Sequence, residues 1–299
     1  MNTSRKDFIR KTLAWGGLGL LSTKNLFSTT VAPLSPQKGY TVQQIIDKII
    51  AQVPGGAKKE TVDTLKSGSG ESVVTGIIVT MFPTIDTIRK AMELKANFII
   101  AHEPTFYNHG DRKDLYGLNE VIAAKDALLK ENNITVWRFH DYAHALLPDA
   151  IGYGLVKKAG WLPYFKKGTP ILDLPPQSLS ALADHLKKQL GISHIKMIGN
   201  LNSICKRIAL MPGAWGPQMH LQFIKMGKPD VIVIGEAQEW ETIEYIRDAQ
   251  ALGKGPAVIV LGHALSEEPG MEWVAEWLQP QFPELTIIHI PSGDPFTWQ

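Results

Sequence analysis

Hydrophobic and polar positions along residues 41–299 follow two alternating patterns. Short apolar or β-branched runs are typical of buried strands, and the stretches between them repeat apolar residues every three or four positions, as amphipathic helices do. A first helix is expected at 41–52, where Thr41 is a candidate N-cap. In the first half we expect strands at 72–80, 96–101 and 134–139, and helices at 84–94 and 118–131. This alternation predicts βαβ units, and therefore an α/β fold with a largely parallel sheet.

The second half of the chain repeats this plan. The elements expected there are helices within 175–190 and at 217–226, 239–252 and 271–278, and strands at 207–211, 231–234 and 257–261. Residues 95–103 can be laid on residues 228–236, since each segment follows a helix, crosses an apolar run and ends in glutamate. The stretch 160–175 is rich in proline and glycine. We therefore predict two related α/β lobes with mostly parallel sheets, at 39–165 and 166–299.

Residues 1–38 are interpreted as an export signal followed by a linker. The head, S-R-K-D-F-I-R-K, is basic and precedes a run of about ten apolar residues, the pattern of a secretory signal. It resembles a twin-arginine signal, except that Lys6 replaces the second arginine. The alternative is an amphipathic first helix of the fold. We expect a periplasmic protein, exported by a twin-arginine-like or general secretory route. No membrane insertion is expected after processing, because no later stretch approaches the roughly 20 apolar residues of a spanning helix.

The net charge and the motifs limit the classes of partner and of site that we expect. The formal net charge is +2, but residues 1–30 contain five cations and one acid, so the remainder is mildly acidic. Such a body gives no electrostatic reason to expect nucleic acid or a membrane surface as partner. The glycine-rich loop at 212–217 lacks the P-loop lysine and the dinucleotide spacing, although its backbone could approach a ligand closely. No G-x-S-x-G elbow is present.

Metal-binding residue types follow three of the expected strands. Ligands of open α/β folds gather at the carboxyl ends of strands, and the residues found there are His102-Glu103, His140-Asp141-Tyr142-Ala143-His144, and His263 with Glu267. Imidazole and carboxylate together suit divalent zinc, manganese, iron, cobalt or nickel. Each group alone is also compatible with a capped turn or a loop pair. Whether His140, Asp141 or the loop residue His109 joins the site stays open.

With these residues in view, the body from about residue 41 to 296 resembles the NGG-interacting-factor-three-like family. This family is also known as the dinuclear-metal-centre hexameric proteins or type-two GTP cyclohydrolase homologues. The motifs that carry the resemblance are A-N-F-I-I-A-H-E-P-T-F, F-H-D-Y-A-H-A, R-I-A-L-M-P-G, D-V-I-V-I-G-E, V-L-G-H-A-L-S-E-E-P-G and the late D-P-F.

The resemblance implies a ligand set for two divalent metal ions. It consists of His102, Glu103, His144, His263 and Glu267. Glu103 stands where the family has a second histidine, and His144 where it has an aspartate, so the set keeps three imidazoles and two carboxylates. It also implies a homo-oligomer, a hexamer around a central opening.

A two-metal site predicts a hydrolase that uses a metal-activated water on a small-molecule substrate. Glu236 and Glu239, which follow the second glutamate-ended strand, are candidate bases; the alternative for both is a plain loop acid. Asp141 or His140 is expected to orient His144. A metal carrier, or an oligomeric scaffold stabilised by metal, is the competing hypothesis.

Overall fold

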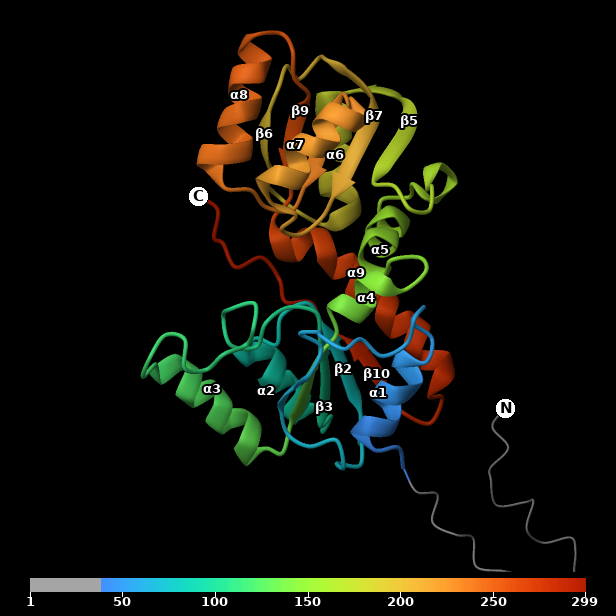
Figure 1. Cartoon of the computed structure of the whole chain (residues 1–299), viewed down its shortest axis with the longest axis vertical. Helices are drawn as coiled ribbons and strands as arrows, with labels where there is room; N and C mark the ends of the chain where they lie inside the picture. Colours follow the sequence, from blue (N-terminus) through green and yellow to red (C-terminus); the bar gives the residue numbers. More distant parts are fainter. Residues whose placement is uncertain (1–38) are drawn as a thin grey trace, which may run out of the picture. The chain divides into compact units, whose positions relative to one another are not determined.

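The structure is a computed structural model that describes residues 39–299; the predicted signal and linker at 1–38 lie outside the described residues. Residues 39–299 form one unit that contains two five-stranded sheets (Figure 1). The predicted α/β fold with two lobes and mostly parallel sheets is confirmed. Within this unit, the structure shows no helix with the length and apolar character needed to cross a membrane.

The first sheet has the strand order β1-β4-β3-β2-β10. The strands are β1 (Leu65–Ser67), β2 (Ile77–Thr80), β3 (Phe98–Ala101), β4 (Thr135–Arg138) and β10 (Ile287–His289). All pairs are parallel except the one at the β1 edge. Every residue of β2, β3 and β4 is buried, because helices cover both faces. One face packs on α1 (Val42–Ile50) and α9 (His263–Leu278), the other on α2 (Ile85–Glu93) and α3 (Glu120–Glu131).

The second sheet has the order β5-β7-β8-β9-β6, with antiparallel strands at both edges. Its strands are β5 (Ile171–Ser178), β6 (Lys196–Ile198), β7 (Ile204–Met211), β8 (Val231–Ile234) and β9 (Ala257–Val260). Its helices are α5 (Ala150–Lys158) and α6 (Leu179–Leu190) on one face, and α7 (Gly216–Gly227) and α8 (Glu244–Ala251) on the other. Shorter helical elements are α4 (Asp141–Ala145), η1 (Leu162–Tyr164), η2 (Glu239–Ile243) and η3 (Gln279–Gln281).

The sequence match between the lobes corresponds to equivalent structure. Strands β3 and β8 are the central strands of their sheets and occupy the same places in the alignment of 95–103 with 228–236. The residue that opens each segment, Lys95 or Lys228, has a left-handed backbone, with φ of 55° and 45°. Glu103 and Glu236 therefore leave equivalent strand ends, one in each lobe.

The C-terminal segment returns to the first lobe, which the division at 165/166 did not anticipate. Strand β10 pairs in parallel with β2, and α9 packs against both strands. Helix α9 also begins at His263 rather than at the expected residue 271, so that His263 and Glu267 lie one helical turn apart on one face. Because α9 starts directly after β9 of the second lobe and ends against the first sheet, it joins the two lobes (Figure 1).

Helices α5 and α9 cross at glycine contacts. A Cβ atom on Gly154 would lie 2.4 Å from the carbonyl oxygen of Pro269, and one on Gly270 would lie 2.6 Å from Cα of Ile151. These distances leave no room for a methyl group on either helix. Since α4 and α5 follow strand β4 and α9 carries Glu267, this crossing sets the distance between two groups of candidate ligands.

We expect Gly154→Ala to destabilise the protein by about 1–3 kcal/mol, because the methyl group forces the two helix backbones apart. Gly152→Ala is the matched control on the same helix. Its Cβ would meet only Asp149 Oδ2, at 4.0 Å, so this change should stabilise the helix by about 0.5–1 kcal/mol. Urea denaturation measures both changes. Equal effects of the two substitutions would show that the crossing tolerates a side chain.

Candidate metal centre

His102, the first residue after β3, is fully buried and its Nε2 atom has no hydrogen-bond partner among residues 39–299. Its Nδ1 atom lies 3.0 Å from the carbonyl oxygen of Phe139. Because a carbonyl only accepts, Nδ1 carries the proton and Nε2 presents a lone pair to the interior. Burial lowers the pKa of His102 well below its usual value, so the ring is neutral. This lone pair lies 3.6 Å from Glu267 Oε2, a second acceptor, and the two share no proton.

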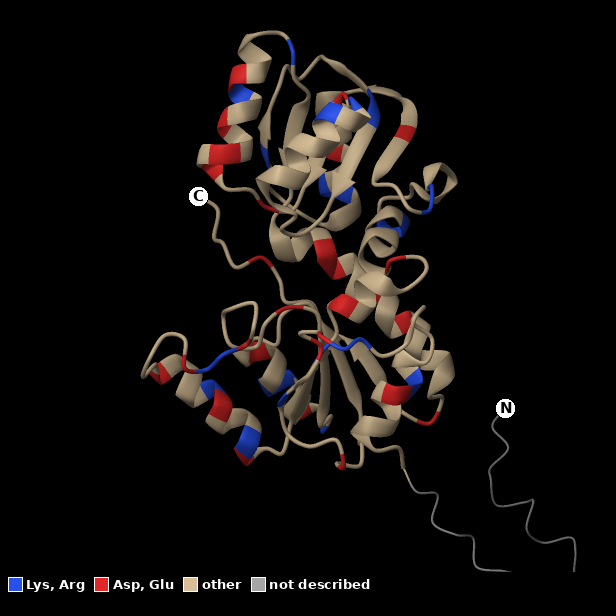
Figure 2. Cartoon of the chain, in the orientation of Figure 1, with Lys and Arg blue, Asp and Glu red and all other residues tan. Residues whose placement is uncertain are grey.

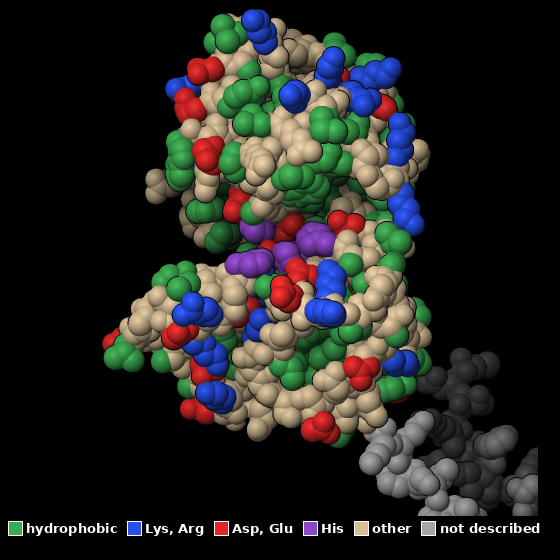
Figure 3. Space-filling model, in the orientation of Figure 1, with side chains coloured by type: hydrophobic (Ala, Val, Ile, Leu, Met, Phe, Trp, Pro, Cys, Tyr) green, Lys and Arg blue, Asp and Glu red, His purple; other side chains and the backbone are tan. Residues whose placement is uncertain are grey.

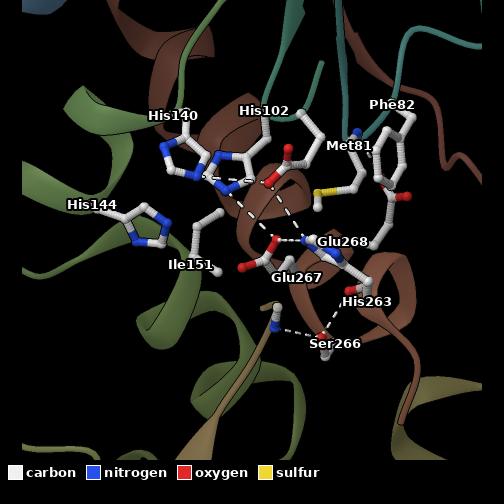
Figure 4. A network of polar contacts seen from close by, with 12 residues as sticks. Met81, Phe82, His102, His140, His144, Ile151, His263, Ser266, Glu267 and Glu268 are labelled. Carbon is white, nitrogen blue, oxygen red and sulfur yellow. Dashed lines mark hydrogen bonds and ion pairs between the residues drawn. The ribbon is translucent and has the colours of Figure 1, made fainter. Parts of the chain in front are cut away.

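Two further imidazoles face His102 from the segment after β4. The rings of His102 and His140 stack with centroids 4.7 Å apart, and the ring of His144 lies edge-on to both, as Figure 4 shows. His140 Nδ1 lies 3.0 Å from Asp141 Oδ1, and His144 Nδ1 lies 3.2 Å from Asp149 Oδ2. A protein acceptor thus holds Nδ1 of all three rings. Ring nitrogens of the three histidines lie within 4.8 Å of one another, a grouping that fits a metal ion.

Glu103 is held by a buried arginine from the neighbouring strand. Arg138, at the end of β4, is 1% exposed, and its Nη2 atom donates to Glu103 Oε2 at 3.1 Å. Arg138 also donates to the carbonyl oxygens of His102 and His109, which fixes the guanidinium. Glu103 Oε1 remains free to face the histidines, 3.6 Å from His140 Nε2 and 3.4 Å from His263 Nε2.

The second lobe contributes His263 and Glu236. His263 lies between the two equivalent glutamates, with Nε2 facing Glu103 and Nδ1 3.2 Å from Glu236 Oε2. Its Nε2 atom is also 3.1 Å from Glu267 Oε2. Burial lowers the pKa of His263, but hydrogen bonds with its three carboxylate partners raise it overall, to about 12. The potential at this point strongly favours positive charge, which is also what a divalent cation needs.

Two further residues position the site. The buried carboxylate of Asp63 accepts the backbone N–H groups of His140, Asp141 and Tyr142 at 2.7–3.0 Å, and so caps the start of α4 from a distant loop. Gly213, in the 212–217 loop, has φ of 71°, and a Cβ atom there would lie 2.1 Å from Glu267 Oε1. The loop backbone therefore approaches the side chain of a candidate metal ligand.

A cavity of about 880 Å³ lies over the cluster. The space-filling view shows histidines gathered in a hollow between the lobes, with acidic side chains beside them (Figure 3), and acidic segments of both lobes lie around the same region in Figure 2. Six of the cavity's lining residues belong to or border the cluster: Glu103, His109, His140, His144, His263 and Glu267. The candidate ligands are thus reachable by a small molecule.

The structure brings together all five residues predicted as ligands, and it adds His140, which sequence reasoning had left open. His102, Glu103 and Glu267 form one group of donors within 4.8 Å, and His102, His140 and His144 form another. Of the candidate bases, only Glu236 reaches the cluster.

Neighbouring contacts resolve three alternatives that the sequence alone leaves open. Glu239 pairs with Lys196 at 3.1 Å and has a largely exposed side chain, so it is not brought to the cluster. The expected orienting role for His144 falls to Asp149, because the carboxylate of Asp141 binds His140 instead. His109 is exposed and lines the cavity, where its ring lies edge-on to His140 with centroids 5.8 Å apart.

Two of the residues missed from sequence, Asp149 and Arg138, have a recognisable signal in retrospect. Asp149 follows a proline and precedes a helix, the position of an N-cap, and its side chain does accept from the backbone of Ile151 and Gly152. Arg138 is the one charged residue of an otherwise uncharged predicted strand at 134–139. A charge in such a strand requires a buried partner, which is Glu103. Asp63 gives no comparable signal, since it acts across almost 80 residues of sequence.

Comparison with known proteins adds a family to this geometry. Residues 41–295 match the model of the family described as Duf34/NIF3 (NGG1p interacting factor 3). A curated relative, the GTP cyclohydrolase 1 type 2 homolog of Clostridium perfringens, is 24% identical over 250 residues, which cover 78% of this chain and 89% of that protein.

Solved structures show the same fold. A Staphylococcus aureus protein superposes with a TM-score of 0.68 at 18% identity, over 87% of this chain and 99% of the other. A Bacillus cereus protein related to NIF3 also gives a TM-score of 0.68, at 16% identity, over 88% of this chain and all of the other. The two-lobed arrangement is therefore that of these structures.

Proposed function

Since this chain belongs to the Duf34/NIF3 family, we propose that it is a metal-dependent hydrolase. The observation that carries the proposal is the pair formed by His102 Nε2 and Glu267 Oε2. Both atoms are buried acceptors, they lie 3.6 Å apart, and the imidazole nitrogen has no hydrogen-bond donor among residues 39–299. A buried lone pair without a donor costs free energy, and a cation placed beside it removes that cost.

We assign the cluster a capacity for two divalent ions. His102, His140 and His144 would hold one ion, and Glu103 Oε1, His263 Nε2 and Glu267 Oε2 mark the place of a second. The two groups of donors adjoin, since His102 Nε2 of one lies 3.6 Å from Glu267 Oε2 of the other. Imidazole with carboxylate suits zinc, manganese, iron, cobalt or nickel. Bound ions of this kind supply Lewis acidity and lower the pKa of a water molecule.

The surrounding residues support turnover rather than storage. The cavity of about 880 Å³ leaves one side of the cluster open to a small molecule, whereas storage sites are closed by protein. Glu236 is our candidate proton acceptor. Its carboxylate lies 3.2 Å from His263 Nδ1, and its side chain is 56% exposed. It can therefore take a proton and release it to solvent.

Elemental analysis followed by a substrate panel tests the proposal. Wild-type protein should retain divalent metal after desalting, and the metal-loaded protein should hydrolyse at least one phosphoester, amide or cyclic-amidine substrate. His263→Ala should lose that turnover. His185→Ala is the control, because His185 bonds to Ala159 on the second lobe, outside the cluster. Metal binding without turnover across the panel would favour a carrier or a metal-stabilised scaffold, and absence of metal would refute the site.

A further inference from the structure

Lys125 is a buried cation in the wall of the same cavity. It lies on α3, which together with α2 covers one face of the first sheet (Figure 1). Among the described residues that line the cavity, it is the only lysine or arginine. The acidic and imidazole side chains of the lining are the histidines of the cluster, His109, and the glutamates Glu103 and Glu267. The wall therefore has one positive charge apart from the candidate metal centre.

The position of Lys125 is one at which an apolar residue is expected. The buried residues of α3 are Ile122, Lys125 and Leu129, which form the helix stripe that faces the core. Lys130, on the same helix, is a contrasting case. It is exposed and pairs with Asp126 at 2.7 Å. A lysine in the buried stripe costs stability, so a role beyond packing is needed to account for it.

The ammonium group of Lys125 has no carboxylate partner. Lys125 is 3% exposed. Its Nζ atom donates to the carbonyl oxygen of Thr105 at 2.8 Å and lies 5.0 Å from the ring centroid of Tyr107. Within residues 39–299, no carboxylate oxygen lies within 4.0 Å of it. Asp111 acts on it from a distance, but that carboxylate is taken by Lys66 at 3.3 Å.

The energetics match this geometry. Burial lowers the pKa of Lys125 to about 8, as expected of an ammonium group that has left water without gaining a counterion. A neutral ligand would leave this cost in place. An anionic group bound beside Nζ would supply the missing counterion and form charge-assisted hydrogen bonds.

We propose that Lys125 binds the anionic group of the substrate, and that the substrate is a small aromatic or heteroaromatic phosphate or carboxylate. The aromatic part follows from Phe82, Tyr107 and Trp215, three aromatic residues that line the same cavity, since aromatic rings pack favourably on one another. The assignment rests on the proposed function in one respect, since the reacting bond would face the cluster of histidines and glutamates. Lys125 is then a specificity residue that orients the substrate.

Calorimetric titration of the metal-loaded protein with three probes tests this assignment. Phenylphosphonate and benzoate carry the two kinds of anion, and benzyl alcohol carries the same ring without charge. We expect Lys125→Met to weaken binding of at least one anionic probe about tenfold or more, and to leave benzyl alcohol unchanged. The anion that loses more affinity identifies phosphate or carboxylate as the native group. Lys125→Arg should retain most of the affinity, because it keeps the charge.

Lys130→Met is the matched control and should bind every probe as the wild type does. Equal anion affinity in Lys125→Met and wild type would overturn the proposal, as would an equal loss for all three probes. If Lys125→Met does not fold, Lys125→Gln and Lys125→Arg give the comparison, since charge is the variable that must matter. Metal content is measured on the same samples. A wild type without metal refutes the proposed function, while a remaining difference between the lysine variants still supports the anion site.

Discussion

Replacing Glu267 with glutamine is expected to remove most of the bound metal and to lower turnover by at least about a thousandfold. Glu267 is 3% exposed, and its Oε2 atom is the acceptor that faces both His102 and His263. Glutamine has nearly the same shape, but it lacks the negative charge that a divalent ion requires and places an N–H₂ group against the cluster. Elemental analysis and the rate on the best substrate of the panel measure the two effects.

Glu268→Gln is the control for this change, because it alters the next residue of the same helix. Glu268 does not face the cluster. Its carboxylate accepts from the backbone N–H of Ser292 at 2.7 Å and lies 2.7 Å from His289 Nε2, and so ties α9 to β10 and the chain beyond it. This variant should lose stability while it keeps its metal. Equal metal content in Glu267→Gln and wild type would exclude Glu267 as a ligand.

Substituting alanine for Gly213 is expected to destabilise the protein by about 2–4 kcal/mol and to reduce its metal content. Two costs combine at this position. The backbone is left-handed, with φ of 71°, and the new Cβ would lie 2.1 Å from Glu267 Oε1. Glu267 cannot yield without leaving His263, because its side chain is buried. Thermal unfolding and elemental analysis measure the two effects.

Gly216→Ala separates the two costs, since it lies in the same loop region with φ of 77° and has no atom within 4 Å of its added Cβ. Only the backbone cost of about 1–2 kcal/mol applies there, and the metal content should not change. If both alanine variants kept full metal content, the close approach of the loop to Glu267 would have no bearing on the site.

The central elements of the fold could be read from periodicity because they are locally encoded. Strands β3, β8 and β9 are fully or almost fully buried apolar runs, and such runs are unambiguous when helical stretches separate them. The edge strands were missed because they contain polar residues and depend on pairing. Leu65–Ser67 has three residues, and Lys196–Ile198 is partly exposed. The pairing of β10 with the first sheet depends on tertiary contacts, which no local sequence pattern predicts.

In the candidate site, too, the locally encoded features could be predicted and the tertiary contacts could not. His102, Glu103 and His263 could be found because each directly follows a buried strand or its last glycine, where topology brings side chains together. His144 and Glu267 lie in the same runs after the strands, and the family resemblance selected His144 rather than His140 as the ligand. The contacts that orient these side chains could not be foreseen. Asp63 reaches α4 across a long stretch of sequence, so its role exists only in the folded chain.

The two lobes differ at one position, and this difference limits each chain to one candidate metal centre of this kind. Glu103 and Glu236 are equivalent, but the residue before them is His102 in the first lobe and Gly235 in the second. A Cβ atom on Gly235 would lie 2.3 Å from the backbone nitrogen of Gly213, so a histidine cannot stand there. The second lobe therefore cannot form a second metal centre like the one beside His102. In a titration with metal, each chain should therefore behave as a single binding unit.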